Sequence, residues 1–302
     1  MFDPHTTQHA PRTQNNEAPK GASLWSDAWK RLRRNRMAML GIGIIILMVI
    51  AALIVPLIST YRYDEINLPM QNMPPYHAHL MGTDGLGRDL LTRVMIGGRI
   101  SLAVGLCATL VSLFIGVTYG ALSGLLGGRA DNIMMRIVDI LYGLPFMFFV
   151  IILVVIAGRS IINLFIALGA VQWLTMARIA RGQALSVKAK DFITAARTSG
   201  ATTPRILFIH IIPNLLGPVI VYFTLTIPAV MLEEAFLSFL GLGVQPPMSS
   251  WGSLANEGVA SITIYPWQIF FPGIAIAATL FALNFLGDGL RDALDPLMKE
   301  KR

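Results

Sequence analysis

The side chains that could carry chemistry are few in this sequence, and most of them are scattered. Of the five histidines, only His77 and His79 are close together. A metal site needs three or four protein ligands, so this pair alone is too small a set. Cys107 is the single cysteine and lies in an apolar stretch, where a thiol is typical of a small packing residue. We therefore predict no catalytic residue, no metal site and no disulfide within the chain.

The adjacent carboxylates Glu233 and Glu234 directly follow a long uncharged stretch, residues 206–232. A second segment of interest is ITAARTSGATTPRILFIHIIPN, residues 193–214, which interrupts the apolar sequence with small and polar residues. No function can be assigned to either segment until the structural elements that position it are known.

The composition indicates that those elements cross a membrane. Hydrophobic residues make up 54% of the chain and charged residues only 14%, whereas a soluble domain has about 25% charged residues. Six stretches contain no Asp, Glu, Lys or Arg, and each is close to or longer than the roughly 20 residues that span a bilayer as a helix. We predict an all-α, polytopic membrane protein with spans at about 37–58, 100–125, 138–157, 160–178, 207–232 and 267–287.

The connections between these spans have their own signals. The segment 235–256 is also uncharged but contains Gly-Leu-Gly, Pro-Pro and Ser-Ser, which predict a loop. It belongs to a long connection, 233–266, on the same side as the connection 59–99. A short helix from Asp89 is expected to lie on the outer surface before the second span. Pro145 is expected to kink the third span.

Lysine and arginine are concentrated on one side of the predicted membrane, in the N-terminal region, the loop 179–206 and the C-terminus. The positive-inside rule then places both termini in the cytoplasm, so the net charge of +7 reflects topology and not nucleic-acid binding. The polar residues 1–22 are predicted to be a disordered cytoplasmic tail, not a signal peptide. Residues 23–36 have an apolar stripe opposite basic residues, which predicts an amphipathic helix on membrane lipid.

A stripe of glycines marks one face of the second span. Gly116, Gly120, Gly124 and Gly128 are four residues apart, a spacing that lets two membrane helices approach closely. We predict that this face packs against another helix; a hinge is the alternative.

The loop 179–206 is predicted to contain one short helix, near 187–199. Gly200 is suited to end that helix, and Thr202 or Thr203 before Pro204 is suited to begin the next one. The loop therefore presents a helix across the inner membrane surface.

AARTSG followed by HIIPN resembles the cytoplasmic signature loop of ABC importer permeases, which begins Glu-Ala-Ala, continues to a Gly and ends near a Pro. Ala195, Ala196, Gly200 and Pro213 match this signature, while Thr194 stands where the family usually has Glu. GTDGLGRDLLTRVMIGGRISLAVGL (82–106), EEAFLSFLGLGVQPPMSSWGSL (233–254) and GDGLRDALDP (287–296) are similar to the dipeptide, oligopeptide and nickel group. The best match is the C-type subunit of bacterial oligopeptide importers.

The resemblance implies a type I ABC importer permease fold in the bacterial inner membrane. It implies a heterodimer with a homologous B-type permease, two ATPase subunits and an extracytoplasmic peptide-binding protein. The sequence has no G-x-x-x-x-G-K-[ST] phosphate loop, so ATP and Mg²⁺ would be bound by the partner ATPases and this chain would hold no cofactor. The same architecture also serves dipeptides, glutathione, nickel and antimicrobial peptides.

The resemblance gives the loop 179–206 the role of a coupling helix that fits a cleft in an ATPase subunit. The residues expected to couple to the ATPase are Lys190, Asp191, Thr194, Ala195, Ala196, Arg197, Gly200, Ala201 and Pro213. Because Thr194 replaces the usual Glu, any ion pair made by that Glu is in doubt.

Glu233 and Glu234 then lie at the outer end of a span, where they either meet the amino terminus of an arriving peptide or are simply solvated at a helix end. A stand-alone ion-coupled transporter is the alternative of a different class. Such a transporter usually needs ionisable residues in mid-membrane, and the predicted spans have none.

Overall fold

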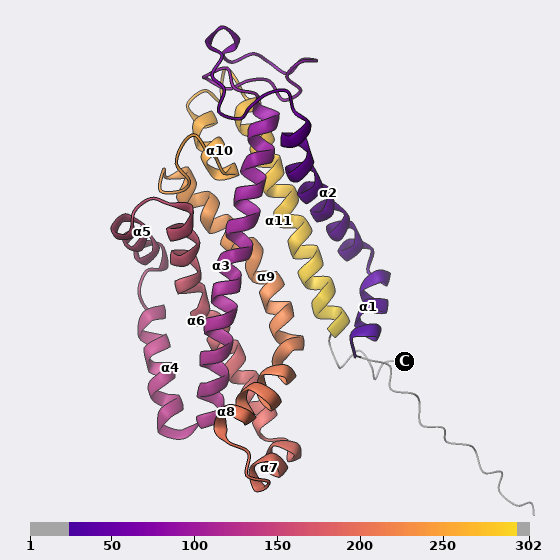
Figure 1. Ribbon diagram of the computed structural model, residues 1–302, viewed down its shortest axis with the longest axis vertical. Coiled ribbons are helices and arrows are strands. Elements are labelled where there is room, and N and C mark those ends of the chain that lie inside the picture. The colour runs from indigo at the N-terminus through magenta and orange to yellow at the C-terminus, as the bar shows by residue number, and fades with distance from the viewer. Residues whose placement is uncertain (1–23, 295–302) are drawn as a thin grey trace, which may run out of the picture.

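The computed structural model describes residues 24–294, and every regular element in that range is a helix (Figure 1). The main elements are α1 (Leu24–Arg34), α2 (Arg36–Ile58), α3 (Leu90–Leu126), α4 (Gly128–Tyr142), α5 (Phe146–Ala157), α6 (Ile161–Lys188), α7 (Asp191–Thr198), α8 (Thr203–Arg205), η2 (Ile206–Ile211), α9 (Ile212–Phe239), α10 (Trp251–Val259) and α11 (Trp267–Leu294). A 3₁₀ turn, η1 (Leu68–Met70), lies in the connection between α2 and α3. The predicted tail 1–22 lies outside the described residues.

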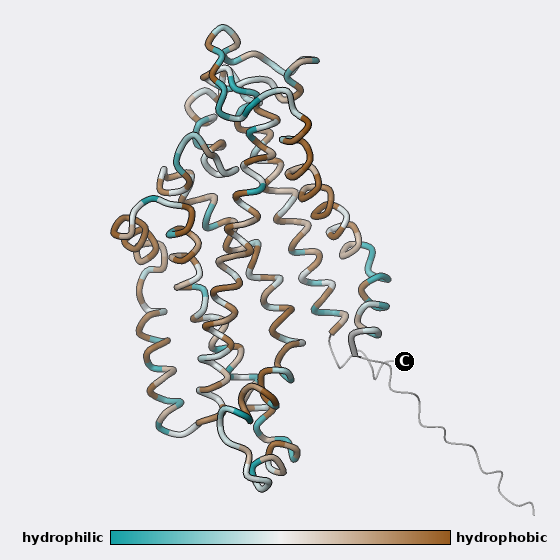
Figure 2. The backbone as a smooth tube through the Cα atoms, in the orientation of Figure 1, coloured by the Kyte–Doolittle hydropathy of each residue, from teal (hydrophilic) through white to brown (hydrophobic). Residues whose placement is uncertain are grey.

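Within residues 24–294, five helices are long and apolar enough to cross a membrane, and the count is six if the bent pair α4–α5 is one span. Brown, hydrophobic segments run along these helices in Figure 2. Residues 203–239 act as one such helix, made of α8, η2 and α9. The predicted all-α polytopic fold is confirmed.

The helices extend well beyond several of the predicted spans. The predicted surface helix at Asp89 and the second span are one continuous helix, α3, for which Asp89 is the N-cap residue. Helix α6 continues to Lys188, so the first ten residues of the predicted loop 179–206 are helical. The predicted loop 235–256 is also partly helical, because α9 ends only at Phe239 and α10 begins at Trp251.

The third predicted span is interrupted rather than kinked. Helices α4 and α5 meet at an angle of 83°. Gly143 caps α4, and Pro145 is the N-cap residue of α5. Proline restricts the residue before it to extended conformations, which ends α4 before Pro145.

Helices α3 and α6 pack closely along the predicted glycine face. A Cβ atom at Gly116 would lie 2.6 Å from the Met176 Cβ atom, and one at Gly120 would overlap the Ala177 carbonyl oxygen. A Cβ atom at Gly124 would lie 2.9 Å from the Ala184 Cβ atom. The fourth predicted member, Gly128, is not on this face, because α3 ends at Leu126.

At the end of the bundle that carries α10, ion pairs of the buried Asp84, Arg88 and Arg93 with one another and with the partly exposed Glu257 join the α2–α3 connection to α3 and α10. The Arg93 guanidinium is 1% exposed and donates to Asp84 and Glu257, at 2.6 Å each. Arg88 also donates to Asp84, at 2.7 Å. The opposing charges are therefore paired and hydrogen-bonded, as buried charges require.

The two neighbouring histidines do not share a site. His79 is buried with its Nδ1 atom 2.8 Å from the Asp89 carboxylate, while His77 is exposed. Within residues 24–294, no group of three His, Cys, Asp or Glu side chains could hold a metal ion.

The amphipathic segment predicted at 23–36 forms α1, which ends at Arg34; Asn35 then caps α2. Ala28 and Leu32 are buried and pack in a small cluster with Ala38 and Ala293. Trp29 is exposed, with the Arg33 guanidinium 5.0 Å from its ring centroid. Helix α1 thus has one face on the bundle and one face outward.

Candidate functional site

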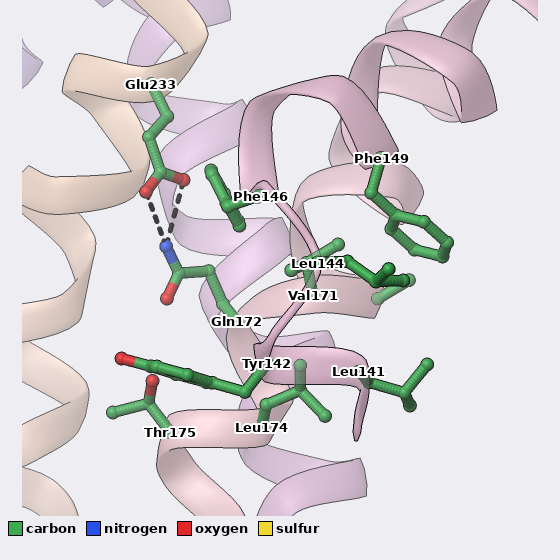
Figure 3. Close-up of a pocket in the computed structure, with 11 residues that line it drawn as sticks. Leu141, Tyr142, Leu144, Phe146, Phe149, Val171, Gln172, Leu174, Thr175 and Glu233 are labelled. Carbon is green, nitrogen blue, oxygen red and sulfur yellow. Dashed lines mark hydrogen bonds between the residues drawn. The ribbon is translucent and has the colours of Figure 1, made fainter. Parts of the chain in front are cut away.

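The break between α4 and α5 opens a cavity of about 360 Å³ toward α6 and α9 (Figure 3). Its walls are mostly apolar, and its polar groups are few. The residues that line it are Leu141, Tyr142, Leu144, Phe146, Phe149, Ala170, Val171, Gln172, Leu174, Thr175 and Glu233. This volume falls within the range of about 300–1,000 Å³ that is usual for small-ligand sites.

Glu233 projects from α9 into this cavity, where it meets Gln172 of α6 (Figure 3). The Gln172 Nε2 atom donates to both carboxylate oxygens, at 2.7 and 2.9 Å. The Glu233 carboxylate is thus held by one amide group, in a wall that contains no basic side chain.

Glu234 has the opposite environment, although it is the next residue. Its side chain is fully buried between α3, α9 and α10, and it accepts from Ser101 at 3.0 Å and from Ser238 at 2.6 Å. The Ser101 hydroxyl also accepts the backbone N–H of Trp251. Glu234 therefore connects three helices and does not line the cavity. The expectation that both carboxylates face the substrate path, or that both are solvated, is wrong for Glu234.

Removing the Glu234 carboxylate is expected to destabilise the end of the bundle that carries α10. Glu234→Ala leaves the Ser101 and Ser238 hydroxyls without their acceptor, which costs about 2 kcal/mol for hydrogen bonds to a carboxylate. The measurement is the unfolding temperature of the purified protein in mild detergent, which should fall for Glu234→Ala. Glu65→Ala, which removes an exposed carboxylate, is the control. Equal unfolding temperatures for both variants and the wild type would contradict this assignment.

The second candidate site is α7, at the opposite end of the bundle from α10 (Figure 1). Its C-terminus has two characteristic hydrogen bonds, from Ala201 N–H to Ala196 C=O and from Gly200 N–H to Arg197 C=O, both 3.0 Å long. This pair of bonds is the Schellman motif, and Gly200 has the positive φ of +80° that the motif requires. Thr202 then holds the N-cap position of α8, without a side-chain capping hydrogen bond, and Pro204 lies in the first turn. The Gly stop and the Pro restart lie where the sequence placed them.

Helix α7 is shorter than predicted, because residues 187 and 188 belong to α6. Most of its predicted coupling residues are exposed. Thr194 and Ala195 are exposed, and Ala196 is half-buried. Lys190, Asp191, Arg197 and Gly200 are exposed as well, whereas Ala201 packs partly against the core.

Ile193, which was not among the predicted coupling residues, connects α7 to the bundle. Its side chain is fully buried in a cluster with Ile206, Leu207 and Ile211 of η2. The π-helical segment η2 lies just before Pro213, which has no N–H to donate to the helical ladder. Since η2 continues into α9, a force on α7 would act directly on the helix 203–239.

Two ion pairs also brace α6 near α7. Arg181 donates to both oxygens of Asp131 on α4, at 2.6 Å each, and Ser123 of α3 donates to the same carboxylate at 2.5 Å. Arg178 donates to Asp139 at 2.8 Å. Helices α3, α4 and α6 are thus tied together at this end by charged groups.

Comparison with known proteins decides the family. A family model described as "Binding-protein-dependent transport system inner membrane component" matches residues 116–300. A second model, described as "N-terminal TM domain of oligopeptide transport permease C", matches residues 23–75. The chain belongs to the binding-protein-dependent permease family. The expected ABC importer permease fold is therefore confirmed, and this permease is a transport subunit and not an enzyme.

Individual relatives match this permease over nearly its whole length. It is 50% identical over 279 residues to the oligopeptide transport system permease protein OppC of Escherichia coli (strain K12), with 92% of each chain covered. It is 46% identical over 281 residues to the OppC protein of Bacillus subtilis (strain 168), covering 93% of this chain and 92% of the relative. It is also 46% identical over 278 residues to the dipeptide transport system permease protein DppC of the same organism, covering 92% and 87%.

Proposed function

We propose that this permease is the C-type subunit of an ATP-driven importer that passes oligopeptides across the bacterial inner membrane. It pairs with a homologous B-type permease, and an extracytoplasmic binding protein delivers the peptide. Two ATPase subunits bind ATP and Mg²⁺, since the sequence has no phosphate loop of its own. The names and full-length identities of the OppC relatives support the oligopeptide substrate.

The observation that carries the coupling role is the placement of α7. Its small residues Ala195 and Gly200 are exposed, while Ile193 fixes the helix to η2. Small exposed side chains allow another protein surface to approach closely, and the buried anchor transmits its motion. Closure of the ATPase dimer would therefore push α7 against the helix 203–239 and change which side of the membrane is open, as alternating access requires.

The proposal is tested by purifying the intact assembly in mild detergent and identifying its components by mass spectrometry. Two ATPase subunits, a second permease and a peptide on the binding protein are the expected result. Recovery of the permease without any ATPase would contradict the proposal. Dipeptides are the second candidate substrate, because the DppC relative has similar identity. Mass spectrometry would also identify glutathione, nickel or an antimicrobial peptide if one of these were the ligand on the binding protein.

The proposed orientation has both termini and α7 in the cytoplasm, in agreement with the distribution of Lys and Arg. A membrane-impermeant thiol reagent is expected to label His77→Cys in intact cells, and to label Thr198→Cys only after the cells are opened. Both positions are exposed, and both variants are made in a Cys107→Ala background. Labelling of Thr198→Cys from outside would reverse the topology.

A further inference from the structure

The cavity beside the α4–α5 break contains a carboxylate, Glu233, that has no cationic partner among residues 24–294. We propose that Glu233 binds the α-ammonium group of a peptide as the peptide crosses the membrane. The inference rests on the proposed function and deepens it, because it states which part of the substrate this subunit recognises and with which side chains.

The charges around the cavity are unbalanced. Of its eleven lining residues, Glu233 is the only acidic one, and none is Lys, Arg or His. Within residues 24–294, the ion pairs all involve other carboxylates. A largely buried carboxylate needs either a cation or several donors, and Gln172 supplies only one amide group. The remaining acceptor capacity of Glu233 is open to a ligand.

The neighbouring carboxylate shows what a structural role requires. Glu234 accepts from two serine hydroxyls and has no exposed surface. Glu233 instead faces a cavity. The contrast between two adjacent residues on one helix indicates that Glu233 is placed to meet something that enters the cavity.

The Glu233 carboxylate has acceptor capacity that suits an ammonium group. Gln172 donates one amide nitrogen to its two oxygens, and the remaining lone pairs are available to a donor. In Figure 3, the Gln172 carbonyl oxygen and the hydroxyls of Tyr142 and Thr175 lie beyond the amide nitrogen, away from the carboxylate. An ammonium group has three donors and no acceptor, so it can donate to the carboxylate without leaving an acceptor of its own unpaired.

Arg178, which contacts the cavity-lining residue Tyr142, does not supply the cation for Glu233. Arg178 stacks on the ring of Tyr142, 4.1 Å from its centroid, but its guanidinium is paired with Asp139. The C-terminal end of α4 and the N-terminal end of α5 also meet here, and their opposite partial charges offset each other. The side chain of Glu233 thus decides the sign of the potential in the cavity.

The position of the cavity agrees with such a role. Transporters commonly bind substrate where a spanning helix is interrupted, and an ionisable side chain within a spanning segment is by default a candidate functional group. The apolar walls, which include Leu141, Leu144 and Phe146, accept a first side chain without selecting its polarity by hydrogen bonding. We therefore expect recognition of the free amino terminus with broad tolerance of sequence.

The test compares a free and a blocked amino terminus in proteoliposomes that contain the whole complex and its binding protein. The probes are radiolabelled trialanine and N-acetyl-trialanine, which differ only at the ammonium group. Glu233→Gln is expected to lower trialanine import by about tenfold relative to the N-acetyl peptide, the size of one charge-assisted hydrogen bond. Any preference of the binding protein for a free amine is the same in the wild-type and Glu233→Gln complexes. It therefore cancels when the import ratio of the two peptides is compared between them.

Glu233→Asp keeps the charge and is expected to retain the preference for trialanine. Glu65→Gln, an exposed carboxylate, is the matched control for charge loss. Gln172→Lys is an independent variant, because it places an ammonium group of the protein next to Glu233. Gln172→Lys should abolish the preference for trialanine over N-acetyl-trialanine while leaving the Glu233 carboxylate paired. It tests the role of Glu233 even if Glu233→Gln does not assemble.

An unchanged preference in Glu233→Gln or Gln172→Lys would overturn the inference, and so would an equal loss of import for both peptides. These outcomes differ from a failure of the proposed function. In that case, the wild-type complex would import neither peptide, and neither peptide would stimulate its ATPase activity.

Discussion

A Gly120→Leu variant is expected not to accumulate as a folded permease. The Cβ atom of any side chain at this position would overlap the carbonyl oxygen of Ala177 and lie 2.9 Å from its Cα atom. Backbone atoms cannot rotate away as the end of a flexible side chain can, so α3 and α6 would have to separate. Overpacking a core typically costs about 1–3 kcal/mol, and a clash with backbone between two spanning helices should reach or exceed the upper end. The readout is the amount of monodisperse complex recovered from detergent.

The glycines that face open space provide the control. Gly43 of α2 is exposed, and no atom lies within 4 Å of a Cβ built there. Gly43→Leu adds the same side chain to a spanning helix and is expected to assemble normally. If Gly120→Leu assembled as well as Gly43→Leu, the close contact of α3 with α6 would be wrong.

The close packing of α3 could be predicted from the sequence because it depends on the regular spacing of glycines. Glycines four residues apart lie on one helix face, whatever the rest of the molecule does. The end of α7 was readable for a similar reason, since Gly200 and Pro204 act through backbone conformations that few other residues adopt. Local rules of this kind need no knowledge of tertiary contacts.

The helix lengths could not be predicted correctly from the sequence, because charged residues were taken as the boundaries of the spans. Arg93 and Arg99 lie inside α3, where Arg93 is paired with Asp84 and Glu257 and Arg99 donates to backbone carbonyls of α2. Arg181 continues α6 because Asp131 meets it from α4. A charged residue can lie inside a long helix when another residue pairs with it. Partners that are far away in the sequence cannot be identified from the sequence alone.

The different roles of Glu233 and Glu234 could not be predicted for a related reason. Adjacent residues on a helix point about 100° apart, so they face different neighbours. One faces the serines of α3 and α9, and the other faces the cavity beside α6. The extension of α9 to Phe239 also places both carboxylates inside a candidate span, which the sequence analysis had taken to be uncharged.

Addition of a bulky cation to α7 is expected to abolish peptide import without preventing assembly. Ala195 is the best position, because it is exposed, whereas Ala196 is half-buried against its own chain. In the proposed coupling role, an arginine at Ala195 would hold the ATPase surface away from α7, so that ATP hydrolysis would no longer move the helix 203–239. We expect Ala195→Arg to lower import at least about tenfold, equivalent to about 1.4 kcal/mol or more of lost coupling. Import of labelled peptide and release of phosphate are measured together in proteoliposomes.

Two controls separate the docking surface from local strain and from charge. Ser186→Arg adds the same charge at the same end of the molecule, at an exposed site on α6, and should preserve import. Gly200→Ala adds strain at a φ of +80° but almost no bulk, since no atom lies within 4 Å of its Cβ position. It should cost roughly 1 kcal/mol of local stability and leave most import intact. Wild-type import by Ala195→Arg would show that α7 is not the surface on which the ATPase acts. Loss of import in Gly200→Ala as large as in Ala195→Arg would instead mean that the shape of the α7 turn, and not access to its small residues, governs coupling.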